Sequence, residues 1–469
     1  MYEQTIKNYE KFGNMKSIIK NSFIRLTLVN ILSNLMVPLA SLIDLAFLGY
    51  LDEIRHLAGV SIATVLFNYI YWTFGFLRMS TTGTTAQANG SRNYHEVKQI
   101  CLRNCLIALT IATIIIIFQY PLREIGFNLL SATPEVKASG INYYKSLIWG
   151  APATLLNFVL IGWFLGLEQG GKVLLLSIVN KGTNIILDYI FIVRWGWESS
   201  GAGSATAISQ YITLVIGMIC VFKFIYLAEI PQLIKNIWQP QVIKKTFILN
   251  RDILIRTFAI ISTFAVFTNL SSYINTLVLV TNTLLLQVVT LAAYFIDGLA
   301  FATESLAGKS YGKRNQKELK ALVKLSGIIG ISIGLIFAFI FCLFPTTLFS
   351  LLTNHTQVIN NISSYVLWLI PILGFGGIAY ILDGYFLGLT QGNLLRNSTL
   401  VASLIGFLPF AIVGLLLKNN HILWLSLAMF MATRAITLGK AIPNIIVEKF
   451  SASIELIKDK NNKKHITPK

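Results

Sequence analysis

Long apolar stretches alternate along this chain with short basic connectors. Each stretch reaches the ~20 residues that an α-helix needs to cross the hydrocarbon core of a bilayer. The pattern predicts spans at residues 26–50, 57–79, 99–120, 140–166, 172–193, 201–227, 253–281, 283–305, 321–344, 362–388, 396–417 and 422–447. We therefore expect an all-α integral membrane protein with twelve transmembrane helices, six in each half of the chain.

A glycine-rich motif occurs twice. The segment 162–170 (GWFLGLEQG) returns 222 positions later as 384–392 (GYFLGLTQG). At the same offset, the glycine, arginine, asparagine, glutamate and lysine of 90–98 recur in 312–320. Two matches in one register indicate a duplicated unit, which is typical of transporters whose halves move about a shared site. Because six spans return the chain to its starting side, we expect two six-helix bundles related by a pseudo-two-fold axis.

The basic residues fall on one side of this twelve-span topology, while the opposite loops are poorer in cations. The positive-inside rule then places both termini in the cytoplasm. We expect a multi-pass protein of the inner (plasma) membrane. We predict a cytoplasmic segment at 1–25, an N-terminal lobe at 26–227 and a cytoplasmic linker at 228–251. A C-terminal lobe at 252–447 and a basic cytoplasmic tail at 448–469 complete the chain.

The composition supports a membrane protein and removes a nucleic-acid interpretation. The chain is 55% hydrophobic and 12% charged, against roughly 25% charged residues in an ordinary soluble domain. The net charge of +18 would otherwise suggest nucleic acid. Since the membrane topology accounts for where the positive charges lie, we expect contact with the lipid bilayer and no nucleic-acid partner.

Cysteine and histidine form no metal or catalytic motif. The four cysteines have no histidine or second cysteine pair near them, and the five histidines fall in loops, at span ends or in the tail. The G-x-x-x-x-G-K pattern that ends at Lys172 has Val173 in place of the hydroxyl residue. We therefore expect neither an enzyme nor a cofactor, and an ion gradient is left as the energy source.

Acidic residues within the predicted spans are Asp44, Asp188, Asp297, Glu304 and Asp383. A charge at the bilayer centre costs at least ~2.5–3.5 kcal/mol, so an ionisable residue there suggests a functional site. Arg78 is the one clear cation among them in this interpretation. The charge at membrane depth then is mainly acidic, which favours a cationic cargo.

Two of these carboxylates have neighbours suited to binding a proton or a sodium ion. Asp44 follows Pro38, and a proline without its N–H should kink or soften the first helix. Asn184 and Asp188 share a helix face at i, i+4, and Thr206 in the next span can approach them. Oxygen ligands suit hard cations, so sodium at Asp44, Asn184 and Asp188 is one interpretation. The alternatives are a structural carboxylate near the outer interface and a polar helix-packing contact.

The second half carries its own acidic residues. Asp297 lies two turns before Glu304 on roughly the same helix face, and Asp383 lies in the tenth span. At the 222-residue offset, Glu304 and Asp383 correspond to Thr82 and Ile161. The halves have therefore diverged in charge, as a division of labour between the lobes would require.

Aromatic residues near the predicted cleft are Tyr71, Trp72 and Trp163. Such side chains can contact flat or cationic ligands. They are equally typical of interfacial anchors or of packing between helices.

Several segments in combination match one family. They are 38–49 (PLASLIDLAFLG), 76–90 (FLRMSTTGTTAQANG), 184–190 (NIILDYI), 297–312 (DGLAFATESLAGKSYG) and 383–392 (DGYFLGLTQG). In these segments the chain resembles the multidrug and toxic compound extrusion (MATE) transporters, most closely their DNA-damage-inducible protein F branch. The resemblance spans the whole transporter body. It implies a MATE fold with a central cavity, and export of organic, often cationic, compounds in exchange for protons or sodium.

The resemblance also implies roles for individual positions. Asp44 aligns with the aspartate of the family's first helix. The family's amino-lobe cation network is matched by Asn184, Asp188 and Thr206. In the second lobe, Asp383 aligns with an acidic position of the tenth helix, and Glu304 with a glutamate typical of the branch.

We therefore expect secondary active efflux by antiport with protons or sodium and by alternating access between two lobes of a monomer. Ion binding at Asp44 and Asp188 would bend the first helix and expel a small organic, cationic substrate. The closest rival is a lipid or lipid-linked oligosaccharide flippase of the same superfamily. Such flippases often have extra helices and a cation-lined cavity, whereas the spans here stop at twelve.

Overall fold

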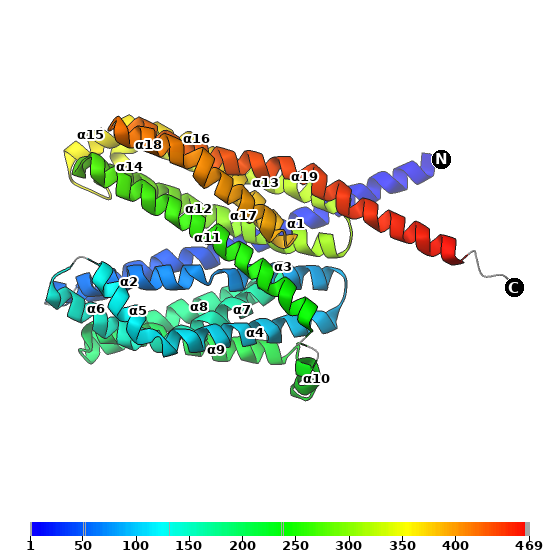
Figure 1. The fold of residues 1–469 in the computed structure, drawn as a ribbon, viewed down its shortest axis with the longest axis horizontal. Coiled ribbons are helices and arrows are strands. Elements are labelled where there is room, and N and C mark those ends of the chain that lie inside the picture. Colours follow the sequence, from blue (N-terminus) through cyan, green and yellow to red (C-terminus); the bar gives the residue numbers. More distant parts are fainter. Residues whose placement is uncertain are drawn as a thin grey trace.

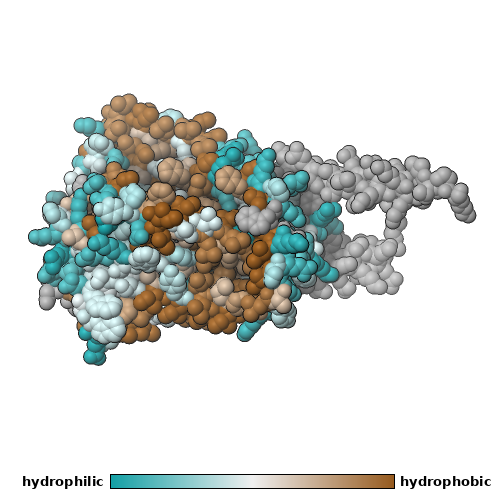
Figure 2. All heavy atoms as spheres, turned by 60° about the horizontal axis from the view of Figure 1, so that its bottom comes forward, coloured by the Kyte–Doolittle hydropathy of each residue, from teal (hydrophilic) through white to brown (hydrophobic). Residues whose placement is uncertain are grey.

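The computed structural model describes residues 2–49, 51, 53–130, 132–235, 237 and 239–464, with side chains described from 20 to 443 within these ranges. The described backbone is almost entirely helical. Twelve of its helical segments are long and apolar enough to cross a membrane, which confirms the predicted number of spans. Figure 2 shows hydrophobic residues gathered in the middle of the molecule and hydrophilic residues towards its two ends, as lipid contact requires.

The amino-terminal lobe contains the first six spans. Its helices are α1 (Tyr2–Gly49), α2 (Ile54–Thr73), α3 (Phe76–Gly90), α4 (Tyr94–Ile117), α5 (Gln119–Leu129), α6 (Pro134–Leu147), η1 (Ile148–Gly150), α7 (Ala151–Gly166), α8 (Gly170–Asp188), η2 (Tyr189–Arg194) and α9 (Glu198–Phe222). The pair α2 and α3 forms one span that is interrupted by a turn at residues 74 and 75. The short helices η3 (Leu227–Glu229) and α10 (Ile230–Lys235) lead to the second lobe.

The carboxy-terminal lobe repeats this plan. Its helices are α11 (Pro240–Ile274), α12 (Thr276–Gly312), α13 (Gln316–Leu343), α14 (Pro345–Phe349), α15 (Thr356–Tyr365), η4 (Val366–Trp368), α16 (Leu369–Gly388), α17 (Gly392–Val401), η5 (Ala402–Phe407), α18 (Leu408–Leu416) and α19 (Asn420–Lys464). The two bundles lie side by side, and the start of α1 and the end of α19 project at the same end of the molecule (Figure 1). We call this end of the molecule the terminal end.

The division between the seventh and eighth spans differs from the prediction. The apolar pattern places it between residues 281 and 283 and also allows another division of 253–305, and in the structure α11 ends at Ile274 and α12 begins at Thr276. Asn275 between them is extended, and its side chain accepts a hydrogen bond from the N–H of Val278 (2.7 Å). An asparagine that caps the first turn in this way stops one helix and starts the next. The apolar pattern alone did not reveal it.

The predicted flanking segments are largely helical extensions of the spans. The segment 1–25 forms the first turns of α1 from residue 2 onwards, and Met1 lies outside the described residues. The predicted linker contains α10 and the start of α11 at Pro240. The predicted tail continues α19 to Lys464, while residues 465–469 lie outside the described residues.

The duplication is visible in where the helices begin. Five pairs of helices start 222 positions apart: α2 and α12 at 54 and 276, α4 and α13 at 94 and 316, α6 and α15 at 134 and 356, α8 and α17 at 170 and 392, and α9 and α19 at 198 and 420. The repeated sequence therefore encodes a repeated structure in which these five helices begin at equivalent positions in both lobes.

One repeated motif closes a helix and opens the next. Arg92 and its counterpart Arg314 adopt positive φ angles of 58° and 56° just after α3 and α12. The side chain of Asn93 then accepts a hydrogen bond from the N–H of Glu96 (3.1 Å), and Asn315 does the same for Glu318 (3.2 Å). This residue pattern, Arg-Asn-x-x-Glu, is thus a helix stop followed by a helix cap.

The other repeated motif brings helices into backbone contact. In the amino-terminal lobe, a side chain at Gly162 of α7 would collide with the carbonyl of Arg78 in α3. In the carboxy-terminal lobe, one at Gly384 of α16 would collide with the carbonyl of Ala300 in α12, which is the counterpart of Arg78. Small residues allow this close packing in a bilayer, where apolar side chains gain little by leaving lipid.

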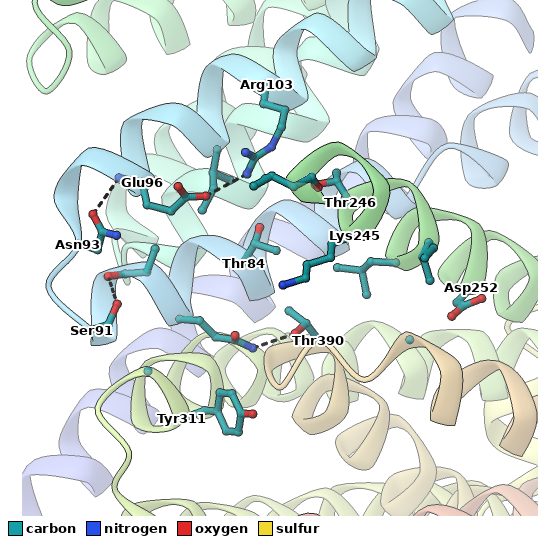
Figure 3. A pocket seen from close by; sticks show the side chains of 18 of the residues that line it. Thr84, Ser91, Asn93, Glu96, Arg103, Lys245, Thr246, Asp252, Tyr311 and Thr390 are labelled. Carbon is teal, nitrogen blue, oxygen red and sulfur yellow. Dashed lines mark hydrogen bonds and ion pairs between the residues drawn. The ribbon is translucent and has the colours of Figure 1, made fainter. Parts of the chain in front are cut away.

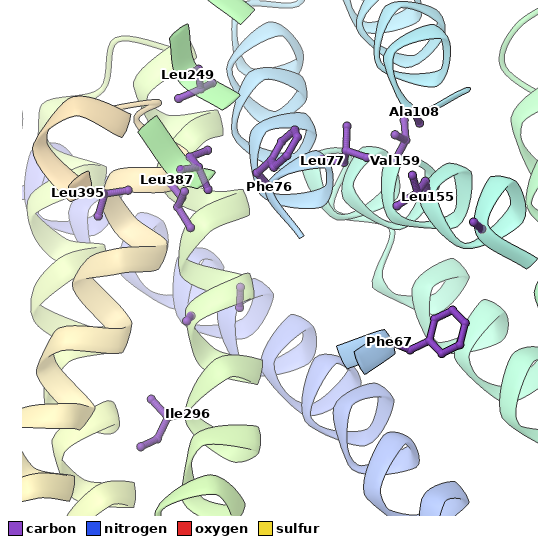
Figure 4. Packing of buried hydrophobic residues seen from close by; sticks show 14 of the residues in the cluster. Phe67, Phe76, Leu77, Ala108, Leu155, Val159, Leu249, Ile296, Leu387 and Leu395 are labelled. Atoms are coloured by element: carbon purple, nitrogen blue, oxygen red, sulfur yellow. The ribbon is translucent and has the colours of Figure 1, made fainter. Parts of the chain in front are cut away.

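The lobes meet at the terminal end through reciprocal contacts. Gly83 of α3 lies against the carbonyl of Leu387, and the counterpart of this pair is a hydrogen bond from Ser305 to the carbonyl of Leu165. The apolar core continues across this interface, because Leu249 and Leu387 of the second lobe belong to the same buried cluster as Phe76 and Leu77 of the first (Figure 4). Close contacts of α3 with α16 and of α12 with α7 therefore hold the two lobes together at the terminal end.

The same interface contains one polar and one ionic cross-lobe pair at equivalent positions. Gln87 Nε2 donates to the carbonyl of Gly388 (2.8 Å) and to Thr390 Oγ1 (3.1 Å). Their counterparts, Lys309 and Glu168, form an ion pair of 2.6 Å between Nζ and Oε1. Midway along the spans, Asn34 Nδ2 of α1 donates to the carbonyl of Tyr294 in α12 (3.3 Å).

Close backbone approach at Gly83 yields a direct test. Gly83→Ala should lower stability by about 1–3 kcal/mol, because the new methyl group overpacks the contact with Leu387. Gly327→Ala is the matched control, since a methyl group there meets nothing within 4 Å and α13 gains helix propensity. Thermal unfolding of the two purified variants in one detergent measures the difference. An equal midpoint for both would contradict the close contact.

Candidate ion-coupling site

The structure brings the predicted amino-lobe residues together. Asn184 of α8 is buried, and its Nδ2 donates to Asp188 Oδ2 (2.9 Å) and to Thr206 Oγ1 of α9 (3.4 Å). The Thr206 hydroxyl in turn donates to the carbonyl of Ala202 (3.0 Å). The carboxyl of Asp44 from α1 faces Asp188. We call these residues, with the two neighbours described next, the amino-lobe cluster.

Lys181 and Tyr143 complete the amino-lobe cluster, and neither was among the site residues expected from the sequence motifs. The charge of Lys181 acts on the carboxyls of both Asp44 and Asp188. The phenol of Tyr143, from α6, faces the same two carboxyls. Lys181, Asn184 and Asp188 follow the i, i+3, i+7 spacing of a single helix face, so the position of Lys181 was accessible from the sequence. Tyr143 carries no such local signal, because only folding brings α6 to the cluster.

The amino-lobe cluster has the chemistry for one small positive charge. Asp44 Oδ1 and Asp188 Oδ1 are buried and have no hydrogen-bond partner among the described residues. Hard monovalent cations prefer such oxygen ligands, and a proton suits them equally. Two carboxylates carry two negative charges, of which Lys181 offsets one. A sodium ion held by Asp44, Asn184 and Asp188 therefore fits these residues, and so does a proton.

A second group of ionisable residues lies at membrane depth between the lobes, and we call it the central ion network. Asp383 of α16 accepts ion pairs from both Arg256 of α11 and Arg434 of α19 through the same oxygen. Asp383, Arg256 and Arg434 are all buried. The Arg434 guanidinium also lies over the rings of Tyr380 (5.5 Å) and Phe430 (5.4 Å).

The central ion network crosses from one lobe to the other. Arg78 of α3 lies 3.5 Å from Glu304 of α12, measured from Nη1 to Oε2, and stacks over the ring of Phe301 at 3.9 Å. Glu304 is fully buried and neither of its carboxylate oxygens has a hydrogen-bond partner among the described residues. The charge of Asp297 interacts with Arg78 and with Arg256. Thus the sequence-predicted acidic residues Asp297, Glu304 and Asp383 all belong to one network.

This geometry corrects the interpretation of the charge at membrane depth as mainly acidic. Arg256 and Arg434 join Arg78, so the central ion network holds three cations against three carboxylates. Lys181 adds a further cation in the other lobe. Arg434 stands in the apolar run MFMATRAITLG and could have been recognised there by the rule applied to the acidic residues. Arg256 lies only one turn inside its predicted span, and at this position the sequence does not distinguish the membrane interface from the membrane interior.

The predicted cavity aromatics occupy three different settings. Trp163 is fully buried inside the amino-terminal lobe, where its indole N–H donates to the carbonyl of Val97 (2.9 Å). It packs in the lobe's core in this structure and lines no cleft. Tyr71 stacks on Phe67 with ring centroids 5.5 Å apart. Trp72 is 57% exposed on the surface of α2.

Helix α1 continues through Pro38, which lies six residues before Asp44. The Ser41 hydroxyl donates to the carbonyl of Val37 (3.1 Å) in the same turn. The kink at Pro38 that we expect from the sequence stays untested by this helix. The proline removes one backbone hydrogen bond from the helix that carries Asp44, which makes this the easiest place for α1 to bend.

Comparisons with known proteins agree with this arrangement. The MatE family model matches residues 30–190 and 253–415, one segment in each lobe. DNA damage-inducible protein F of Escherichia coli (strain K12) is 32% identical over 421 residues, which cover 88% of this chain and 90% of that protein. Multidrug export protein MepA of Staphylococcus aureus (strain NCTC 8325 / PS 47) is 20% identical over 218 residues, 46% of this chain and 48% of that one.

Solved structures share the fold at lower identity. A MOP superfamily transporter from Pyrococcus furiosus superposes with a TM-score of 0.83 at 21% identity, covering 91% of this chain and 96% of the other. A multidrug resistance MATE family transporter in an outward-facing conformation gives 0.83 at 20% identity with the same coverage.

Twelve spans in two repeated bundles, with ionisable clusters held at membrane depth, define a polytopic membrane transporter. The sequence match in both lobes makes the assignment specific: the chain belongs to the MatE family. The fold and the membership expected from the sequence motifs are thereby confirmed.

The double pairing of Asp383 predicts the effect of removing one arginine. Arg434→Met should destabilise the protein by about 3–5 kcal/mol, because breaking a buried ion network leaves charge without compensation. Arg194→Met, at an exposed arginine near the end of the fifth span, is the control and should change stability by less than about 0.5 kcal/mol. Thermal unfolding in detergent measures both variants. Equal stability of Arg434→Met and the parent would show that the network is not needed for folding.

Proposed function

We propose that this protein exports small organic compounds across the inner membrane by antiport with protons or sodium. Its membership of a transporter family gives the general activity, and its similarity to multidrug export protein MepA points to organic cargo. The observation that carries the coupling proposal is the amino-lobe cluster. Its two carboxylates and one lysine leave a single uncompensated negative charge, and two buried carboxylate oxygens lack partners. One monovalent ion would neutralise it.

Placement of Asp44 on α1 supports coupling between ion binding and movement. Asp44 lies beyond Pro38, whereas the earlier part of α1 packs on α12 of the other lobe through Asn34. Binding a proton or sodium at Asp44 and Asp188 removes repulsion between α1 and α8. The segment after Pro38 can then shift towards α8 while the earlier segment stays docked on the opposite lobe.

Closure at the terminal end supports alternating access. The contacts of Gly83 and Ser305 and the ion pair of Lys309 with Glu168 hold the lobes together there. We place this end in the cytoplasm, because the basic residues that flank the spans gather on the side of the termini. The described state is then closed to the cytoplasm. Because one chain holds both lobes, we propose that it works as a monomer.

We propose a cationic cargo, although fewer uncompensated negative charges support it than the sequence suggested. The central ion network is balanced in charge, so a net negative field comes only from the amino-lobe cluster. The flippase alternative is not favoured, because the described residues form twelve spans and one of the similar proteins is a multidrug export protein.

The coupling role of Asp44 predicts a specific loss of transport. Asp44→Asn should abolish ion-driven efflux while leaving the protein folded and inserted, because the amide cannot release a proton or balance a cation. Purified protein in liposomes, with imposed proton or sodium gradients and labelled organic cations, measures the effect and identifies the ion. Glu135→Gln, at an exposed residue of α6, is the control. Full transport by Asp44→Asn would refute the coupling role.

The ion pair between the lobes predicts how the terminal end opens. Lys309→Glu should weaken closure by about 1 kcal/mol, because it places two carboxylates against each other, and the swap of Lys309→Glu with Glu168→Lys should restore it. Distances between spin labels at residues 94 and 320, on α4 and α13, report the closed population. An unchanged distance distribution in Lys309→Glu would show that the pair does not hold the lobes.

The hydrogen-bonded pair Gln87 and Thr390, which is equivalent to Lys309 and Glu168, allows the opposite test, in which closure is strengthened. Gln87→Lys with Thr390→Glu should add a second ionic pair and raise the closed population. Thr390 and Glu168 share positive φ angles of 54° and 59°, so a glutamate already fits this backbone conformation in the other lobe. A closed population that falls in this double variant would argue against electrostatic closure.

A further inference from the structure

A cavity of about 800 Å³ opens at the terminal end between α3 and α4 of one lobe and α11 and α12 of the other. Its wall combines polar and apolar side chains: Thr84, Gln87 and Ser91 come from α3 and its end, Thr246 comes from α11, and Ile100, Ile248 and Leu249 are apolar. Figure 3 shows Thr84, Ser91 and Thr246 around a common space, with the Lys245 ammonium pointing into it. The cavity is well apart from the amino-lobe cluster, which is built from α1, α6, α8 and α9.

Positive charge predominates in this cavity. Its cations are Arg103, Lys245 and Arg314, and its acidic residues are Glu96 and Asp252. Each acidic group is already compensated: Glu96 accepts from Arg103 Nη2 (3.1 Å), and the side chain of Asp252 pairs with two arginines outside the cavity lining, Arg251 (3.0 Å) and Arg396 (2.7 Å).

Two of the cations have unused donors. Arg103 is 7% exposed, and its Nε is buried without a hydrogen-bond partner among the described residues. Lys245 is exposed and makes no ion pair in the described part of the chain. A buried guanidinium donor without a partner is costly, so a ligand that accepts from it would be stabilised.

Three polar residues of this cavity have apolar counterparts at the equivalent positions of the other repeat. At the 222-residue offset, Arg103 corresponds to Leu325, Lys245 to Phe23, and Thr84 to Leu306. These three counterparts belong to the main apolar core, where Phe23 and Leu306 are buried. The fold therefore needs only apolar packing at these positions. The fold that the two lobes share therefore does not account for the basic groups at these positions.

The cavity lies at the level where a bilayer changes from hydrocarbon to headgroups. Helix α11 has 35 residues, about 52 Å of helix, which exceeds a hydrocarbon core of ~30 Å. Its residues 242–252 line the cavity at the terminal end, before the middle of the span. Next to Lys245, the apolar side chains of Phe247 and Ile248 are 68% and 38% exposed. Polar donors and exposed apolar side chains on adjacent turns suit the polar headgroup and the apolar acyl chains of a lipid.

We propose that this cavity binds a phosphate ester, with Arg103 and Lys245 donating to the phosphate oxygens. Guanidinium and ammonium groups are the usual partners of phosphate, and the surrounding hydroxyls and amides suit a glycerol or similar polar moiety. The headgroup of an anionic phospholipid and a soluble phosphorylated compound share this chemistry. Since the wall comes from both lobes, the bound ester stabilises the state that is closed at the terminal end. This inference does not depend on the proposed coupling ion or cargo.

The test uses the full-length purified protein in neutral detergent. Thermal unfolding is followed during titration with short-chain phosphatidylglycerol, short-chain phosphatidylcholine or glycerol phosphate. Phosphatidylglycerol should raise the unfolding midpoint more than phosphatidylcholine, whose choline group brings a positive charge to a basic cavity. A response to glycerol phosphate with the same variant dependence identifies a soluble ester as ligand, and a response to phosphatidylglycerol alone identifies a lipid headgroup.

Matched variants make the test specific. Lys245→Gln should weaken apparent binding about tenfold, as expected for loss of one charge-assisted contact, and Lys245→Arg should retain it. Lys244→Gln is the control, since this neighbouring lysine is exposed and does not line the cavity. Arg103→Gln should also weaken binding, and Lys245→Gln decides the outcome if that variant does not fold. Equal binding by Lys245→Gln and the parent, or equal loss in Lys244→Gln, would overturn the proposal.

Discussion

The structure depends on how closely its helices approach one another inside a bilayer. Apolar side chains gain little by exchanging lipid for protein, so association rests on backbone proximity and on polar contacts. The duplicated glycines provide this proximity: Gly162 allows α7 to pack closely against α3, and Gly384 allows α16 to pack closely against α12. Each helix pair then presents one surface at the terminal end, and this surface packs against the equivalent surface of the other lobe: α3 contacts α16, and α12 contacts α7. Both the lobe structure and the contact between lobes follow from the same small residues.

Charge inside the membrane is arranged differently in the two parts of the protein. The central ion network is balanced and its members hold one another, with Asp383 bound by two arginines and Arg78 reaching across to Glu304. The amino-lobe cluster is unbalanced and has free carboxylate oxygens. A balanced network resists exchange with solvent ions, whereas an unbalanced one attracts them. The unequal repeats therefore differ in charge balance: the carboxylates and arginines of the central ion network match in number, whereas the two carboxylates of the amino-lobe cluster face one lysine.

Hydropathy and repetition were sufficient to predict the twelve spans and the duplicated bundles, because both depend on long segments. The i, i+4 pair of Asn184 and Asp188 was also predictable, since helix geometry fixes it locally. What could not be predicted rests on contacts between distant segments: the approach of Tyr143 to the amino-lobe cluster and the pairing of Arg256 with Asp383 across 127 positions. The helix stop at Asn275 was missed for another reason. A single capping residue interrupts an apolar run without changing its average.

The lysine in the amino-lobe cluster has a consequence for energetics. With Lys181 fixed beside Asp44 and Asp188, the proposed site takes up one monovalent ion and no more. Exchange of that ion for one singly charged organic cation moves no net charge across the membrane. A potential contributes ~2.3 kcal/mol per elementary charge per 100 mV, so a cycle of this kind would gain nothing from it. The concentration ratio of the driving ion would then set the limit of cargo accumulation, and a cell could depolarise without losing export.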